Sequence, residues 1–145
     1  MLERRSALAA VYRPGRIGAQ EGPAAVSICE RSSRALLQLS GWPESFQRLC
    51  RQLETLMTCQ MPADGLRAVS YGERAIFRVG PERLWVAGPN EDDLLQTVGG
   101  AALGEDAVVT EIGHSRTVLR VAGAGARELL NRGLPVDLHP AVFPV

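Results

Sequence analysis

The 145-residue sequence contains no lysine, because all sixteen of its basic residues are arginine. This absence excludes enzymes that form a Schiff base and P-loop nucleotide-binding proteins, since both use a lysine amine. Sixteen acidic residues balance the sixteen arginines, and no block of like charge occurs along the chain. The long-range field that attracts nucleic acids or anionic lipids is therefore missing, and we expect neither partner.

Long apolar runs and a cysteine framework are also missing. No run reaches the roughly 20 residues that span a bilayer, and the first residues lack the apolar segment of a secretory signal. The three cysteines, Cys29, Cys50 and Cys59, match neither a disulfide framework nor the ligand spacing of a zinc site. We therefore expect a cytoplasmic protein with reduced thiols and no metal.

The composition is that of a globular protein, with 46% apolar and 22% charged residues. Residues 1–22 mix Arg, Gly, Pro and Ala without a period, which predicts an extended N-terminal arm. Residues 23–145 have the length and the apolar content of one domain. We therefore predict a single α+β domain over this range.

Periodicity predicts the elements of that domain. Residues 26–30 and 35–39 alternate apolar and polar side chains around a short polar turn, which predicts a hairpin. A helical stripe of apolar residues follows Pro43, which suits the first turn of a helix. Strands are predicted near residues 67–71, 74–79 and 84–87. A short helix capped by Asn90 is expected to end at Gly99.

The last third of the sequence repeats part of the first. Residues 34–41 align without gaps on residues 116–123, and in both copies the predicted strand leads into a predicted helix. The apolar residues also alternate in the same phase. The repeat predicts a pseudo-duplicated α+β fold in which antiparallel sheets carry helices on one face.

Residues 110–144 contain a long ordered motif. Its residues are Thr110, His114, Arg116, Thr117, Arg120, Gly123, Leu129, Leu130, Gly133, Pro135, Asp137, Leu138, His139, Pro140, Phe143 and Pro144. This motif resembles that of the sarcosine oxidase gamma subunit family. Two departures from the family pattern lie near its histidine, where Glu111 and Gly113 replace an Asp and a Ser.

The resemblance implies a fold similar to the folate-binding domain of aminomethyltransferase, with paired ferredoxin-like halves. It implies that the chain is a non-catalytic gamma subunit of heterotetrameric sarcosine oxidase. That enzyme as a whole demethylates sarcosine to glycine and yields hydrogen peroxide and 5,10-methylenetetrahydrofolate. The resemblance also implies contacts with the alpha and beta subunits, and with the delta subunit indirectly. FAD, FMN, NAD, tetrahydrofolate and zinc are expected on those partner subunits and no cofactor on this chain.

Four polar residues of the motif, His114, Arg116, Asp137 and His139, are candidate site residues. His114 lies in a predicted tight turn, where it could act as a general base or close the turn together with Ser115, and Arg116 is expected to pair with an acid. Asp137 and His139 could form an acid–base pair, half of a metal site or a local brace. The interpretation that we favour is structural or interfacial for all four, with no catalytic residue.

Two alternative functions remain open. Glu111 could hold the donor edge of a pterin in a folate-binding module, and the chain could be an orphan protein-interaction paralogue. A stand-alone hydrolase or transferase built on His114 or His139 is a third hypothesis. Family members continue beyond the Phe-Pro pair, so we expect the C-terminal part of the family domain to be absent, with an open sheet edge and marginal stability.

Overall fold

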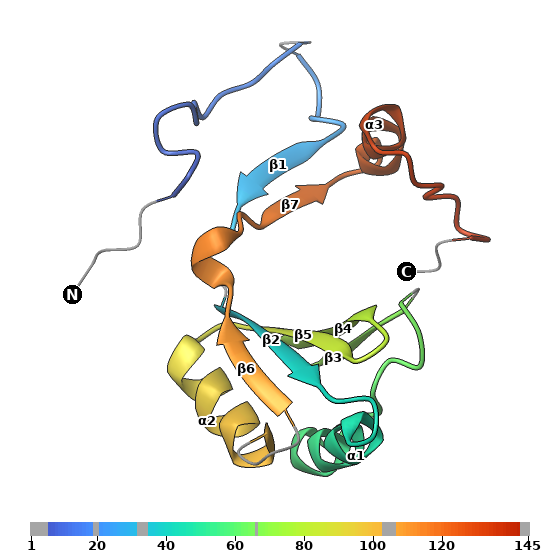
Figure 1. Ribbon diagram of the computed structural model, residues 1–145. Helices are drawn as coiled ribbons and strands as arrows, with labels where there is room; N and C mark the ends of the chain where they lie inside the picture. Colours follow the sequence, from blue (N-terminus) through green and yellow to red (C-terminus); the bar gives the residue numbers. More distant parts are fainter. Residues whose placement is uncertain (1–5, 19–20, 32–34, 66, 103–106, 143–145) are drawn as a thin grey trace. The chain divides into compact units, whose positions relative to one another are not determined.

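The computed structural model describes residues 6–18, 21–31, 35–65, 67–102 and 107–142 (Figure 1). The chain divides into two compact units: residues 33–116 form one, and residues 1–32 together with 117–145 form the other. Both contain antiparallel sheets and helices, which confirms the α+β class. The single domain expected over residues 23–145 stays a prediction.

The unit of residues 33–116 contains a five-stranded antiparallel sheet in the order β3-β4-β5-β2-β6. The strands are β2 (Ala35–Gly41), β3 (Ala68–Tyr71), β4 (Arg74–Gly80), β5 (Arg83–Gly88) and β6 (Ala107–Glu111). The meander β3-β4-β5 follows the predicted strands closely. Its register shifts between Arg78 and Gly80, just before the turn into β5.

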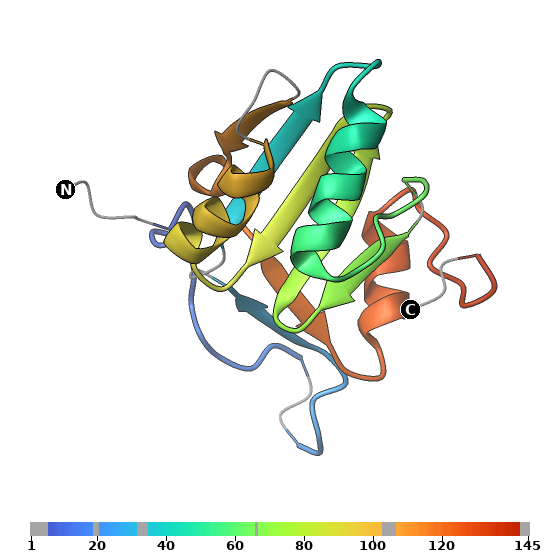
Figure 2. The same cartoon turned by 90° about the horizontal axis from the view of Figure 1, so that it is seen from below.

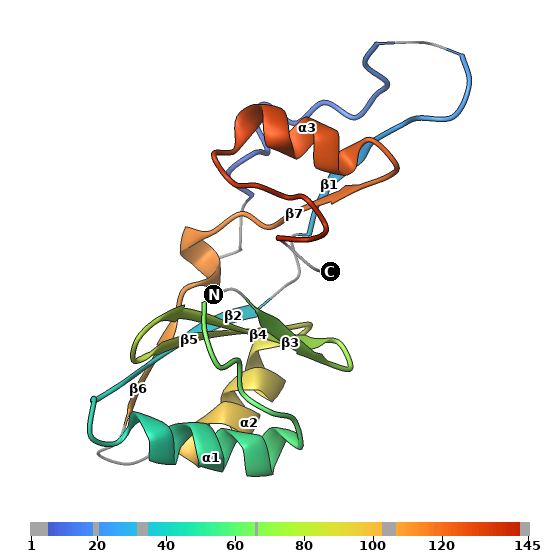
Figure 3. The ribbon, with the colours of Figure 1, turned by 90° about the vertical axis from the view of Figure 1, so that its right-hand side faces the viewer.

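Helices α1 (Phe46–Met57) and α2 (Glu91–Ala102) cover one face of this sheet (Figures 2 and 3). Because side chains alternate along a strand, Leu37 and Leu39 of β2 point to the helices, whereas Gln38 points to the other face. Both leucines are fully buried. The core consists of Ala35, Leu37, Leu39, Phe46, Leu49, Leu53, Met57, Ile76, Leu84, Val86, Leu94 and Val98.

Helix α1 confirms the predicted amphipathic stripe. Its buried residues Phe46, Leu49, Leu53 and Met57 recur at three- and four-residue spacing and face the sheet. The helix ends at Met57. The next residue, Thr58, has a left-handed φ of 49°, which stops the helical hydrogen-bond pattern.

Helix α2 begins as predicted but does not end where expected. The Asn90 side-chain oxygen accepts hydrogen bonds from the backbone N–H groups of Asp92 and Asp93, at 2.9 and 3.4 Å. The helix then continues through Gly99 to Ala102, so the predicted stop is wrong. A helical glycine costs only about 1 kcal/mol relative to alanine, and burial of Val98 anchors the preceding turn.

Gly88 lets α2 approach the end of β5. A Cβ atom built on Gly88 would lie 2.8 Å from Cδ1 of Leu94, which is fully buried. No real side chain packs at that distance, so a residue larger than glycine would force the Leu94 side chain to shift. None of the helices in the described part of the chain is long and apolar enough to cross a membrane.

The other unit contains a two-stranded sheet in which β1 (Ser27–Glu30) pairs with β7 (Leu119–Ala122), followed by α3 (Ala126–Gly133). The predicted hairpin between residues 26–30 and 35–39 is therefore wrong. Strand β2 has β5 on one edge and β6 on the other, so neither edge is left for β1. The described residues before Ser27 contain turns but no helix or strand.

The two copies of the internal repeat have the same order of strand and helix, but their strands pair in different sheets. Strand β2 precedes α1, and β7 precedes α3. However, β2 lies inside the five-stranded sheet, whereas β7 lies in the two-stranded one. The pseudo-duplication into ferredoxin-like halves stays a prediction.

Replacing Leu53 by alanine should test how far the core depends on α1. We expect a loss of about 2–5 kcal/mol in the free energy of unfolding, because the cavity would open beneath a fully buried side chain. The matched control is Leu56→Ala on the same helix, where Leu56 is 49% exposed and the expected change is below about 1 kcal/mol. Urea denaturation followed by circular dichroism measures both, and equal losses would contradict the assigned helix face.

Candidate functional site

The family motif runs from β6, through a 3-10 turn, to the segment after α3. Thr110 and Glu111 end β6, and His114 lies in the turn η1 (Gly113–Ser115). Arg116 follows this turn directly. The tight turn predicted around His114 is thus present between two strands, as expected from its sequence.

Glu111 and Ser115 hold this turn together. The Glu111 carboxylate oxygen Oε1 accepts a hydrogen bond of 2.5 Å from the backbone N–H of Gly113, which is buried. Its other oxygen, Oε2, lies 3.9 Å from Nε2 of His114, whose side chain is 60% exposed. The Ser115 hydroxyl donates a hydrogen bond of 2.9 Å to the carbonyl of Ile112. The polar atoms of the turn are therefore engaged mainly with the chain itself.

Arg116 contacts an aromatic ring and the neighbouring Ser115. None of the ion pairs in the described residues includes Arg116. Its guanidinium lies over the ring of Trp85, 5.6 Å from the ring centroid. Its Nη1 also donates to the carbonyl and the hydroxyl of Ser115, at 3.0 and 3.1 Å. Among the described residues this side chain thus contacts an aromatic ring, which the sheet brings under it, and the pairing with an acid stays a prediction.

Trp85 and Gln38 are functional candidates that sequence reasoning missed. They are cross-strand partners on β5 and β2, and the indole Nε1–H donates a hydrogen bond of 3.0 Å to Oε1 of Gln38. The alternation of side chains along β5 could have identified Trp85 from the sequence, because it places this residue on the face opposite to the buried Leu84 and Val86.

Asp137 and His139 brace the segment after α3 without pairing through their side chains. Asp137 Oδ1 accepts a hydrogen bond of 2.9 Å from the backbone N–H of His139, and His139 Nδ1 accepts one of 3.2 Å from Ala141. Asn131 of α3 adds a third bond, to the backbone N–H of Leu138 at 3.2 Å. This arrangement matches the local brace rather than the acid–base pair.

Gly123 occupies a position that no other residue could fill without a shift of the backbone. Its φ is 115°, and a Cβ atom on it would lie 2.3 Å from the carbonyl oxygen of Ala25. The same carbonyl accepts a hydrogen bond of 3.0 Å from Gly125. This motif glycine is therefore explained by close backbone approach next to the β1–β7 pair.

Within the described ranges, no group of three or more His, Cys, Asp or Glu side chains is placed to hold a metal ion. The three cysteines are free. Burial raises the pKa of the Cys50 and Cys59 thiols above the ordinary value. At Cys50 the Arg78 guanidinium partly offsets the effect of burial, and the Glu54 carboxylate raises the pKa of both thiols further. Both thiols are thus weak nucleophiles at neutral pH.

The arrangement defines an α+β protein whose motif residues shape turns and present a cation on an aromatic ring. Residues 52–145 match the model of the sarcosine oxidase gamma subunit family. That match covers more than half of the chain, so the chain belongs to this family.

Individual relatives agree with the family match. The gamma subunit of sarcosine oxidase from Corynebacterium sp. strain U-96 is 34% identical over 71 residues, which are 49% of this chain and 35% of that one. The gamma subunit from Arthrobacter sp. is 31% identical over 71 residues, which again are 49% of this chain and 35% of that one. The aligned region thus spans about a third of each curated relative.

A solved structure supports the fold. A chain of heterotetrameric sarcosine oxidase from Corynebacterium sp. U-96, in complex with pyrrole 2-carboxylate, has a TM-score of 0.74 and 28% sequence identity. The likeness covers 86% of this chain and 64% of that chain. The likeness to the aminomethyltransferase domain stays a prediction.

The role of Glu111 in the turn can be tested by two substitutions. Glu111→Ala should lower the free energy of unfolding by about 1–2 kcal/mol, because the buried Gly113 N–H loses this acceptor. Glu111→Gln keeps a side-chain oxygen and should cost less. His114→Ala is the control, with an expected change within about 0.5 kcal/mol because that side chain is largely exposed. Urea denaturation measures all three, and an equal loss in His114→Ala would contradict the hydrogen-bond assignment.

Proposed function

We propose that this chain is a non-catalytic, gamma-type subunit of a heterotetrameric sarcosine oxidase. In that role it supports the oxidative demethylation of sarcosine to glycine, with formation of hydrogen peroxide and 5,10-methylenetetrahydrofolate. The family match over residues 52–145 carries the proposal. The likeness to a chain of a solved heterotetrameric sarcosine oxidase supports it independently.

The geometry of the motif supports a structural role. An acid–base mechanism needs a residue pair that converges on a place where substrate can sit. His114 instead lies on an exposed turn beside Glu111, and the polar atoms of Asp137 and His139 bond the backbone of their own segment. These residues order the chain locally, which fits a subunit that contributes surface rather than chemistry.

The alpha and beta subunits are the proposed direct partners, and the delta subunit an indirect one. The flavins, NAD, tetrahydrofolate and zinc are proposed to be bound by those partners, as the resemblance of residues 110–144 implies. Glu111, the residue considered for a folate contact, accepts a hydrogen bond from Gly113 through Oε1. This engagement favours the subunit role over a folate module.

Co-expression tests the proposed function. The chain, expressed with alpha and beta subunits from the same organism, should co-purify as one complex that releases peroxide in the presence of sarcosine. The matched preparation without this chain should be less stable or less active, because an interface is left uncovered. A complex that assembles and turns over fully without the chain would show that the proposed structural role is wrong.

A further inference from the structure

We propose that the helix-free face of the five-stranded sheet binds an acidic, aromatic-containing segment of a partner subunit, with Arg116 and Trp85 as its anchor. The proposal rests on the proposed function, since it names the surface through which the subunit meets its partner. It concerns only the unit of residues 33–116.

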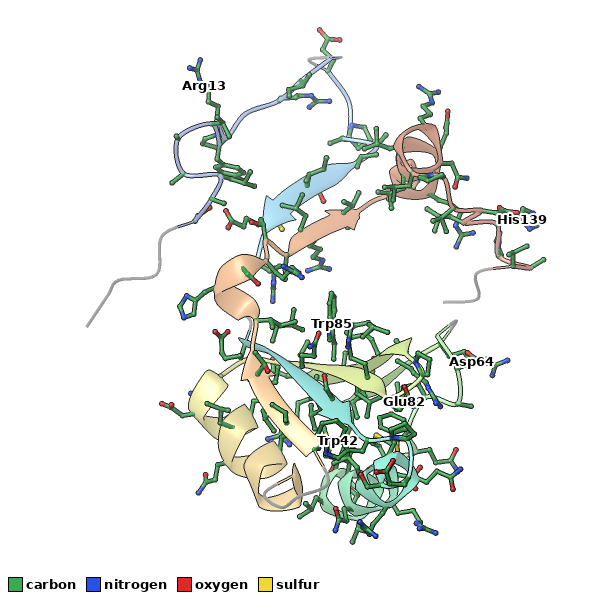
Figure 4. The ribbon with its side chains drawn as sticks, in the orientation of Figure 1. Arg13, Trp42, Asp64, Glu82, Trp85 and His139 are labelled. Carbon is green, nitrogen blue, oxygen red and sulfur yellow. The ribbon has the colours of Figure 1, made fainter. Side chains whose placement is uncertain are left out.

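The surface is defined by one row of cross-strand partners. Thr110, Gln38, Trp85 and Phe77 lie side by side on β6, β2, β5 and β4. All four share the parity that points away from α1 and α2, and Figure 4 shows Trp85 projecting from the side of the sheet opposite to those helices. We call this row, together with Arg83, Val108 and Arg116, the platform.

Trp85 and Arg116 are held in place before any partner arrives. The hydrogen bond from the indole to Gln38 sets the orientation of the ring. The Arg116 guanidinium is held by the ring below it and by two hydrogen bonds to Ser115, which is itself bonded to Ile112. A guanidinium ordered in this way loses little side-chain entropy on binding, which favours tight recognition of a carboxylate.

The charge of the platform selects an anionic partner. On strands β2 to β6, the positions that share this face include Arg83, which is exposed, and no acidic residue. Arg116 is exposed as well and takes part in none of the ion pairs of the described residues. Two positive charges beside a strand face without acidic positions favour an acidic segment over a neutral or basic one.

Exposed apolar side chains next to these charges favour a polypeptide as the occupant. Phe77 is 37% exposed and Val108 55% exposed, although both lie on sheet strands. Arginine and aromatic residues are typical anchors of protein interfaces. The hollows lined by residues 63–65 with 78–81, and by residues 71–74 with Pro89 and Asp93, include neither Trp85 nor Arg116. A small ligand would need such concavity, whereas a flat sheet face suits an extended protein segment.

The test measures binding of this chain to the purified alpha and beta subunits by biolayer interferometry, at low and at physiological salt. Arg116→Glu should weaken binding at least about tenfold and reduce its salt dependence, because attraction becomes repulsion. Trp85→Ala should weaken binding comparably. Arg116→Lys should bind more weakly than the unaltered chain but more tightly than Arg116→Glu, because lysine keeps the charge but not the planar fork. Arg51→Glu, on the exposed face of α1, is the matched control and should bind like the unaltered chain.

The outcomes separate this proposal from the proposed function. If the unaltered chain does not bind the partner subunits, the proposed function is wrong and this proposal falls with it. If it binds and Arg116→Glu and Trp85→Ala bind equally well, the platform is not the interface while the subunit role stands. Quenching of Trp85 fluorescence by millimolar benzoate, without any effect of Arg116→Glu on the complex, would assign the platform to small anions and overturn the proposal.

Two further occupants would also overturn it. A dimer of the free chain in size-exclusion chromatography that Arg116→Glu converts to a monomer would show that a second copy binds there. Loss of the folded state in free Arg116→Glu, with Arg51→Glu still folded by circular dichroism, would assign the platform to a contact with the rest of the chain. Variants that all stay folded and monomeric, together with selective loss of partner binding in Arg116→Glu and Trp85→Ala, support the proposal.

Discussion

The alternation of side chains along β2 is the constraint on which the rest of the larger unit depends. Leu37 and Leu39 are fully buried beneath α1 and α2, and the strand has neighbours on both edges. Because side chains alternate with a period of two, the register that buries these leucines must place Gln38 on the opposite face beside Trp85. The core and the platform are therefore two consequences of the same pairing, and a slip of one residue would exchange them.

Several residues within the family motif have physical explanations in backbone contacts. Glu111 fixes the turn through the Gly113 N–H, Asp137 fixes the segment after α3, and Gly123 leaves room for the carbonyl of Ala25. Arg116 differs from these, because its contact with Trp85 lies on an exposed surface. Its position is therefore relevant to what the surface presents.

Local patterns predicted most of the elements correctly. The apolar stripe from Phe46 to Met57 gave the helix, and turn residues separated the three strands of the meander. The predictions failed where a local sequence pattern was used to predict a contact between distant residues. The alternation of residues 26–30 identified a strand but not its partner, and Gly99 weakened a helix that tertiary packing of Val98 stabilises.

The sequence by itself determined the family, the α+β class, the faces of α1 and β2 and the exclusion of lysine chemistry, since each of these depends on residue identity or on short-range periodicity. Only the tertiary structure decided that β1 pairs with β7, that Arg116 lies over Trp85, and that Gln38 orients the indole. These contacts join residues distant along the chain. Their formation depends on which strand edges remain free after the core has packed, and no local pattern records that.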